Sequence, residues 1–156
     1  MKYIVFVIII ALVVFFVTRN SNNKKAVIEN NAIGKDFLTR NKVVDGVVET
    51  ASGLQYQILQ QGKGTEHPSA SSKVTVHYHG SLLDGTVFDS SVDRGEPISF
   101  SLNQVISGWT EGVQLMVIGD KFKFFIPSKL AYGNSAAGKI APGSLLIFEV
   151  ELLQIQ

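Results

Sequence analysis

The chain is 156 residues long, which corresponds to one domain with additional segments. Lys and Arg total 14 against 13 Asp and Glu, and a formal net charge of +1 gives no reason to expect nucleic acid as a partner. The absence of cysteine excludes disulfides, thiolate chemistry and a lipid-modified N-terminal cysteine.

The first element is an apolar run from Ile4 to Val17, with Lys2 before it and Arg19 shortly after it. A membrane helix needs ~20 apolar residues, whereas the core of a signal peptide needs ~7–15. The run ends in bulky residues and not in the small residues of a cleavage site. We therefore predict an uncleaved signal anchor that crosses a membrane through residues 3–18. The alternative of a buried core helix lacks the polar face that such a helix turns to water.

The segment that follows changes from polar to weakly helical. Asn20 to Glu29 is polar and charged, which predicts a tether. From about Asn30 to Val44, apolar residues at Ile33 and Phe37 share one helical face and predict a short linker helix.

From Thr50 onward the pattern is that of β-structure. Apolar residues alternate with polar ones over residues 54–58, 73–80, 86–88, 98–102, 122–126 and 146–152, which predicts five or six strands. Asp84-Gly85 predicts a hairpin turn, and the segment around Trp109 predicts one short helix. These elements predict an α+β fold in which an antiparallel sheet curls around that helix.

Trp109 is the only tryptophan in the chain, and Gly112 makes its helix brief. One interpretation is a core residue, because aromatic side chains bury ~150–250 Å² each. The other is the floor of an apolar pocket, with Val105 and Ile106 at its rim. The segment alone leaves both open.

Two histidines, His77 and His79, lie on the strand face opposite Tyr78. Such a pair is a possible start of a zinc site. With no cysteine and no evident third ligand, we predict solvent-facing histidines and no metal.

The ordered motifs of the chain resemble those of the FKBP family of peptidyl-prolyl cis–trans isomerases, over about Ala51 to Gln156. The motifs are Gly53-Leu54-Gln55-Tyr56, Val76-His77-Tyr78-His79-Gly80, Asp84-Gly85-Thr86-Val87-Phe88-Asp89-Ser90-Ser91, Arg94-Gly95-Glu96-Pro97, Val105 to Gly112, Ile126-Pro127, Ala131-Tyr132-Gly133 and Leu146 to Leu153. The preceding segment resembles the helix-to-domain junction of bacterial, macrophage-infectivity-potentiator-like members, which usually carry a longer dimerising helical region.

The resemblance implies a set of pocket residues. The implied catalytic residues are Tyr78, Phe88, Asp89 and Tyr132, and the implied substrate-binding residues are Arg94, Ile98, Val105, Ile106, Trp109, Ile140 and Phe148. It also implies that the Ile106 N–H and the Tyr132 hydroxyl bind peptide carbonyls, and that Arg94 orients Asp89. Ile98 stands at a wall position that is often aromatic in the family.

The implied activity is isomerisation of X-Pro bonds in unfolded or partly folded proteins, without a cofactor and with possible inhibition by FK506-like macrolides. The competing class is a non-catalytic binding or chaperone module, and a third is a structural β-domain on a tether. Non-catalytic modules typically lose the acid or the pocket aromatics, which this chain retains.

Three further expectations concern the whole chain. The expected segments are residues 1–18 as membrane anchor, 19–50 as tether and short helix, and 51–156 as isomerase domain. We expect a monomeric catalytic domain, because only about fifteen helical residues are predicted before the strands. We expect the domain to face the periplasm from the inner membrane of a Gram-negative bacterium, although Arg19, Lys24 and Lys25 favour the alternative, a cytoplasmic C-terminus.

Overall fold

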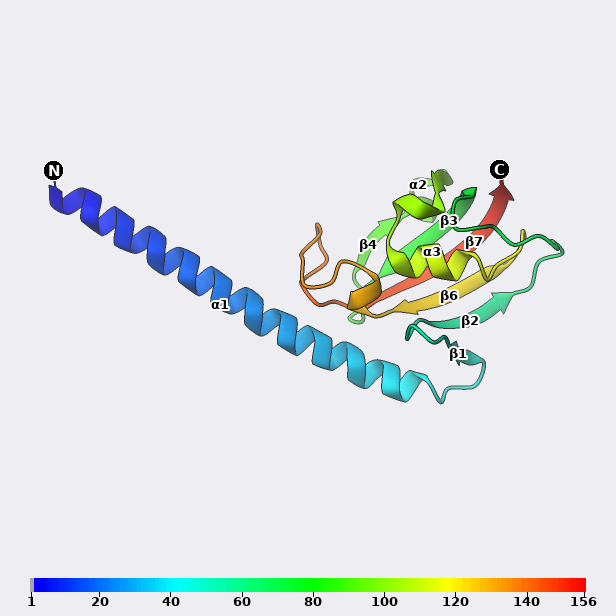
Figure 1. Ribbon diagram of the computed structural model, residues 1–156, viewed down its shortest axis with the longest axis horizontal. Helices are drawn as coiled ribbons and strands as arrows, with labels where there is room; N and C mark the ends of the chain where they lie inside the picture. Colours follow the sequence, from blue (N-terminus) through cyan, green and yellow to red (C-terminus); the bar gives the residue numbers. More distant parts are fainter. Residues whose placement is uncertain (1) are drawn as a thin grey trace.

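The structure is a computed structural model that describes the backbone of residues 2–156 and the side chains of residues 18–156 (Figure 1). Its strands are β1 (Val47–Glu49), β2 (Gln55–Gln60), β3 (Lys73–Ser81), β4 (Val87–Ser90), β5 (Ile98–Ser101), β6 (Lys121–Ile126) and β7 (Leu146–Ile155). Its helices are α1 (Lys2–Asn41), α2 (Ser91–Arg94) and α3 (Ser107–Val113), with 3-10 turns η1 (Leu102–Gln104) and η2 (Ser128–Leu130).

The described strands form one seven-stranded antiparallel sheet in the order β1-β2-β6-β7-β3-β4, with β5 pairing the first half of β3. Each strand that the alternation predicts is present. The expected number of strands, five or six, is wrong, because the sheet has seven. The additional strand is β1, which pairs with β2 and lies in the segment that the sequence pattern placed before the domain. The chain turns at Gly85, whose φ of +88° is a conformation that glycine adopts without strain.

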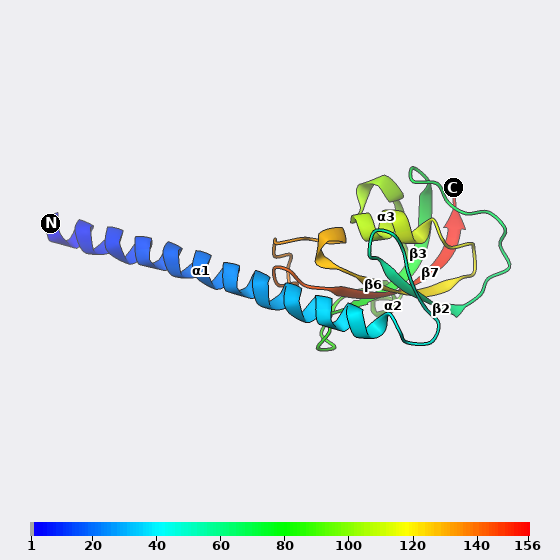
Figure 2. The same cartoon turned by 60° about the horizontal axis from the view of Figure 1, so that its bottom comes forward.

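Helix α3 lies on one face of the sheet, where the core is found (Figure 2). Two glycines allow this close approach. A Cβ at Gly108 would lie 2.5 Å from the Ile126 side chain, and one at Gly112 would lie 2.7 Å from Phe124. The glycines that weaken the helix in isolation are therefore what lets Trp109 reach the sheet.

Helix α1 is a single rod of 40 residues that leaves the sheet and carries the N-terminus away from it (Figures 1 and 2). The expectation of a polar tether over 20–29 and a separate short helix ending near Val44 is wrong, because the helix runs continuously through 20–29 and ends at Asn41. Polar residues do not stop a helix. The sequence of α1 contains no proline, and its one glycine, Gly34, does not break the helix.

The C-terminal part of α1 is docked on the domain. Phe37 contacts Phe125 with 5.7 Å between ring centroids, and Asn30 Nδ2 donates to the Pro142 carbonyl at 2.9 Å. A Cβ at Gly34 would lie only 3.3 Å from Leu145, so this glycine faces the domain. The helix and the sheet are thus fixed to each other at this end.

The predicted membrane segment covers residues 1–18. The side chains of residues 1–17 lie outside the described residues, so nearly all of this prediction does too. Within the part of the chain that is described, no helix combines the length and the apolar character needed to cross a membrane.

Candidate functional site

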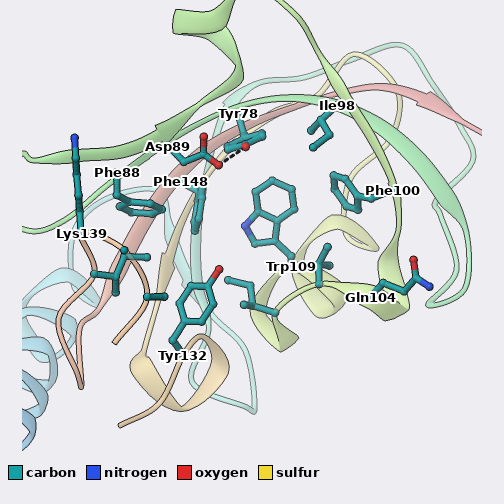
Figure 3. A pocket seen from close by; sticks show the side chains of 15 residues that line it. Tyr78, Phe88, Asp89, Ile98, Phe100, Gln104, Trp109, Tyr132, Lys139 and Phe148 are labelled. Carbon is teal, nitrogen blue, oxygen red and sulfur yellow. Dashed lines mark hydrogen bonds between the residues drawn. The ribbon is translucent and has the colours of Figure 1, made fainter. Parts of the chain in front are cut away.

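A cavity of about 730 Å³ opens between α3, the strands β3 to β5 and the loop after η2 (Figure 3). Ten of the eleven residues that the sequence proposed for the site line this cavity, and the eleventh, Arg94, lies at its edge. The lining residues are Tyr78, Phe88, Asp89, Ile98, Phe100, Gln104, Val105, Ile106, Trp109, Tyr132, Ala137, Gly138, Lys139, Ile140 and Phe148.

The centre of the cavity is aromatic. Trp109 is 5% exposed, and its ring meets Tyr78 and Phe148 edge to face, with centroid distances of 5.3 and 5.1 Å. Phe88 meets Phe148 in the same manner at 5.3 Å. Such T-shaped pairs add to the stability that the buried area provides, and they hold each ring in one orientation. The two interpretations of Trp109 are therefore both correct, since one side of it belongs to the core and the other lines the cavity.

The indole nitrogen of Trp109 is the one buried side-chain nitrogen or oxygen without a hydrogen-bond partner in the described chain. It lies on the side of the indole nearer Phe148 (Figure 3). Buried polar groups are nearly always paired, and this N–H is a donor that no other group of the described chain uses.

The wall beside Trp109 depends on Gly80 in β3. A Cβ at this position would lie 2.7 Å from both the Phe88 and the Phe148 ring, closer than carbon atoms approach in proteins. The absence of a side chain at Gly80 therefore sets where the two phenylalanine rings stand.

The rim carries one hydrogen-bonded acid. The Tyr78 hydroxyl donates to Asp89 Oδ2, and Arg94 donates from Nη1 to Asp89 Oδ1 and from Nη2 to the Tyr78 hydroxyl at 3.0 Å. The Arg94 guanidinium also stands 5.8 Å from the centroid of the Tyr78 ring. The expectation that Arg94 pairs with Asp89 is confirmed, and the carboxylate is fixed from both sides.

This arrangement sets the charge states at the rim. Partial burial acts to raise the pKa of Asp89, but the hydrogen bonds from Tyr78 and Arg94 and the arginine charge outweigh it, so the pKa lies below its ordinary value. Burial, and then the hydrogen bond to Asp89, raise the pKa of the Tyr78 phenol. At neutral pH Asp89 is therefore ionised and Tyr78 remains a donor.

Asp89 precedes a helix that it does not cap. The N-cap of α2 is Ser90, whose Oγ accepts from the Asp93 N–H at 3.1 Å. The Asp89 carboxylate points instead to Tyr78 (Figure 3).

Two elements on the opposite side provide polar groups. Tyr132 is 44% exposed and turns its hydroxyl toward the cavity (Figure 3), while Ile106 directly precedes α3. Amides at the start of a helix are not used by the helix itself and remain available to ligands. Ile140 is buried and lines the cavity from the loop.

Sequence reasoning missed the remaining lining residues, among them Phe100, Gln104 and Lys139. Phe100 follows Ile98 at an interval of two in β5, so the strand alternation already placed both on one face. Phe100 also contacts Trp109 at 5.3 Å between centroids and supplies an aromatic wall beside Ile98. Gln104 lies in η1 and Lys139 lies in a loop. Neither segment has a sequence periodicity from which the direction of a side chain can be predicted.

His77 and His79 lie on the other face of the sheet, as expected, and each ring is half-buried. Within the described residues, no group of three or more His, Cys, Asp and Glu side chains is arranged to hold a metal ion.

Comparison with known proteins assigns the chain to a family. Residues 64–153 match the family described as FKBP-type peptidyl-prolyl cis-trans isomerase, and residues 10–58 match the domain amino terminal to it. The FkpA isomerase of Aeromonas hydrophila is 58% identical over 132 residues, which are 85% of this chain and 49% of that protein.

The outer membrane protein MIP of Legionella longbeachae is 48% identical over 133 residues, which are 85% of this chain and 57% of that protein. The chain thus spans about half the length of these relatives. The crystal structure of FkpA from Escherichia coli superposes with a TM-score of 0.86 at 41% identity, covering 95% of this chain and 71% of that one. The chain belongs to the FKBP-type peptidyl-prolyl cis-trans isomerase family.

Proposed function

We propose that the chain catalyses cis–trans isomerisation of X-Pro bonds in unfolded or partly folded proteins, with the proline bound in the aromatic cavity. The observation that carries the proposal is the cavity centred on Trp109, with a single hydrogen-bonded acid, Asp89, at its rim. The five-membered apolar ring of proline fits an aromatic cavity. The open side of the cavity leaves room for the polypeptide before and after the proline.

The reaction needs no nucleophile. Its barrier of ~18–20 kcal/mol is the loss of amide resonance as the bond twists. The planar amide is more dipolar than the twisted one, so an apolar cavity destabilises the ground state more than the transition state. Each ~1.4 kcal/mol of this difference accelerates the reaction tenfold.

The polar groups hold the peptide while the bond rotates. We assign the Tyr132 hydroxyl and the Ile106 N–H to peptide carbonyls, and Asp89 to the carbon of the twisting carbonyl. Tyr78 and Arg94 keep the Asp89 carboxylate ionised and in place. We assign catalytic roles to Tyr78, Phe88, Asp89 and Tyr132, and substrate binding to Arg94, Ile98, Val105, Ile106, Trp109, Ile140 and Phe148.

The test is a protease-free assay of X-Pro isomerisation in a short peptide, with the full chain and its Tyr132→Phe variant. Acceleration by the wild type, and a loss of rate in a folded Tyr132→Phe variant, support the proposal. No acceleration by the folded wild type would end the enzyme claim and favour a non-catalytic module. FK506-like macrolides, which suit the same apolar cavity, serve as competitors in this assay.

We further propose that residues 3–18 anchor the chain in the inner membrane of a Gram-negative bacterium, with the domain in the periplasm. The support is the apolar run between Lys2 and Arg19 and its lack of a small-residue cleavage site. The alternative is a cytoplasmic domain. Fusion of alkaline phosphatase or a fluorescent protein to Gln156 decides between them, since a bright fluorophore with an inactive phosphatase would overturn the periplasmic orientation.

We also propose that the catalytic domain, residues 51–156, acts as a monomer. One chain supplies all residues of the cavity. The short helix from which we expected a monomer is not observed, because α1 has 40 residues. Analytical ultracentrifugation of residues 51–156 tests this, and a stable dimer of this domain would contradict it.

A further inference from the structure

Strand β3 has a gap in its pairing directly behind the cavity. Along one edge, residues 73–76 pair with β5 and residues 79–81 pair with β4, which leaves His77 and Tyr78 between them, with the N–H and carbonyl of Tyr78 facing the gap. Ser91, the first residue of α2, fills the gap. Its Oγ accepts from the Tyr78 N–H at 2.8 Å and donates to the Tyr78 carbonyl at 3.3 Å. Ser91 is fully buried, so no water replaces these bonds.

His77 holds the same hydroxyl from the far face of the sheet. Its Nδ1 lies 2.9 Å from Ser91 Oγ. A hydroxyl has one proton, which serves either the Tyr78 carbonyl at 3.3 Å or His77 Nδ1 at 2.9 Å, and the tautomer of the imidazole decides which. In both cases the Nδ1–Oγ hydrogen bond ties His77 to Ser91, and an amide group at the Nδ1 position takes either role.

The other end of α2 returns to the cavity. Arg94, three residues after Ser91, donates to Asp89 and to the Tyr78 hydroxyl. The short helix thus bonds the backbone of Tyr78 at its start and the side chain of Tyr78 at its end. A change in the position of Ser91 is transmitted to the arginine that fixes Asp89.

We propose that His77 is a positioning residue for the isomerase cavity, which acts through Ser91 on α2 and so on Arg94 and Asp89. The inference rests on the proposed isomerase function. The His77 side chain lies on the face of β3 opposite that of Tyr78, and its effect requires only a hydrogen-bonding group at the position of Nδ1.

The matched variants are His77→Asn and His77→Gln, because an asparagine amide reaches the Nδ1 position and a glutamine amide the Nε2 position. We expect His77→Asn to retain the wild-type kcat/KM. We expect His77→Gln and His77→Leu to lower it about three- to tenfold, the effect of one lost hydrogen bond. His67→Leu, in the exposed loop before β3, is the control for loss of an imidazole and should change nothing.

A double-mutant cycle separates positioning from a general loss of structure. In an Arg94→Ala background, His77→Leu should change kcat/KM by less than about twofold, because its route to Asp89 is already broken. Losses that multiply in the double variant would overturn the proposal, as would equal activity of the Asn and Leu variants.

A readout independent of catalysis is the NMR signal of the Arg94 guanidinium in the full chain. It should shift in His77→Leu and remain in place in His77→Asn. An unmoved signal in both contradicts the positioning role even where activity is present. An inactive wild type whose Arg94 signal does respond contradicts the isomerase function but leaves the link from His77 to Arg94 intact.

Discussion

At the scale of the residue, the site depends on how Asp89 is held. Its carboxylate is 44% exposed, yet Tyr78 and Arg94 occupy both of its oxygens. An exposed ion pair of this kind contributes little to folding, about 0–1 kcal/mol. Its structural role is therefore small compared with the role we assign to it in catalysis.

Replacement of Asp89 by leucine tests whether this residue contributes more to catalysis than to folding. Asp89→Leu should lower kcat/KM at least tenfold, which is the loss of ~1.4 kcal/mol in the transition state, and change the unfolding free energy by less than about 1 kcal/mol. The peptide assay and thermal unfolding measure the two effects. Asp45→Leu, at an exposed turn, is the control. Wild-type activity in a folded Asp89→Leu variant would remove Asp89 from the catalytic residues.

The lowered pKa of Asp89 predicts how activity depends on pH. A carboxyl group whose folded pKa lies below its unfolded value of about 3.9 stabilises the protein above that value, and the stabilisation is lost as pH falls through the folded pKa. Asp89 thus stays ionised at neutral pH, and kcat/KM should show no acidic limb from it between pH 5 and pH 8. A limb in this range that disappears in Asp89→Asn would contradict the assignment.

At the scale of the element, α3 sits close to β6 because it carries glycine where it touches Phe124 and Ile126. Gly112→Ala adds a methyl group that would lie 2.7 Å from the Phe124 ring. Although alanine favours the helix, we expect a loss of ~1–3 kcal/mol from overpacking. Denaturant unfolding measures it, and a stabilised variant would show that helix propensity outweighs the contact.

Phe37 docks α1 on Phe125 of β6, which is not among the residues that line the cavity. Phe37→Ala removes the contact with Phe125 and should lower stability by about 1–2 kcal/mol, less than a fully buried phenylalanine, because Phe37 is half-buried. The activity on a short peptide should be unchanged. Ile33→Ala, at a position that is 52% exposed, serves as the matched control. A fall in kcat/KM for the folded Phe37 variant would indicate that the helix influences the cavity.

The elements also show what the sequence was able to predict. Six strands follow from alternation, because each has one face toward the core. β1 was missed because three residues are too few for a pattern, and the continuation of α1 through residues 20–29 was missed because this polar stretch has no apolar stripe. The cavity residues and the pairing of Arg94 with Asp89 followed from motif resemblance, whereas the bond from Arg94 to the Tyr78 hydroxyl and the aromatic wall of Phe100 required the fold.

At the scale of the whole molecule, a helix of 40 residues extends about 60 Å at ~1.5 Å per residue and ends on the domain. With residues 3–18 in a membrane, residues 19–41 of this helix, about 35 Å at ~1.5 Å per residue, would lie outside it, and the part from Asn30 onward is docked on the domain. All residues that line the cavity fall within residues 78–148, and α1 meets the loop after η2 at Pro142, two residues beyond Ile140 in the lining.

The most direct test of catalysis is exchange NMR of a proline-containing peptide at equilibrium, with a sub-stoichiometric amount of the full chain. The account predicts that the cis-to-trans and trans-to-cis rates rise by the same factor, in proportion to the protein, while the populations of the two isomers stay constant. A peptide that binds, shifts its populations and exchanges at the uncatalysed rate would show a binding module instead of an isomerase.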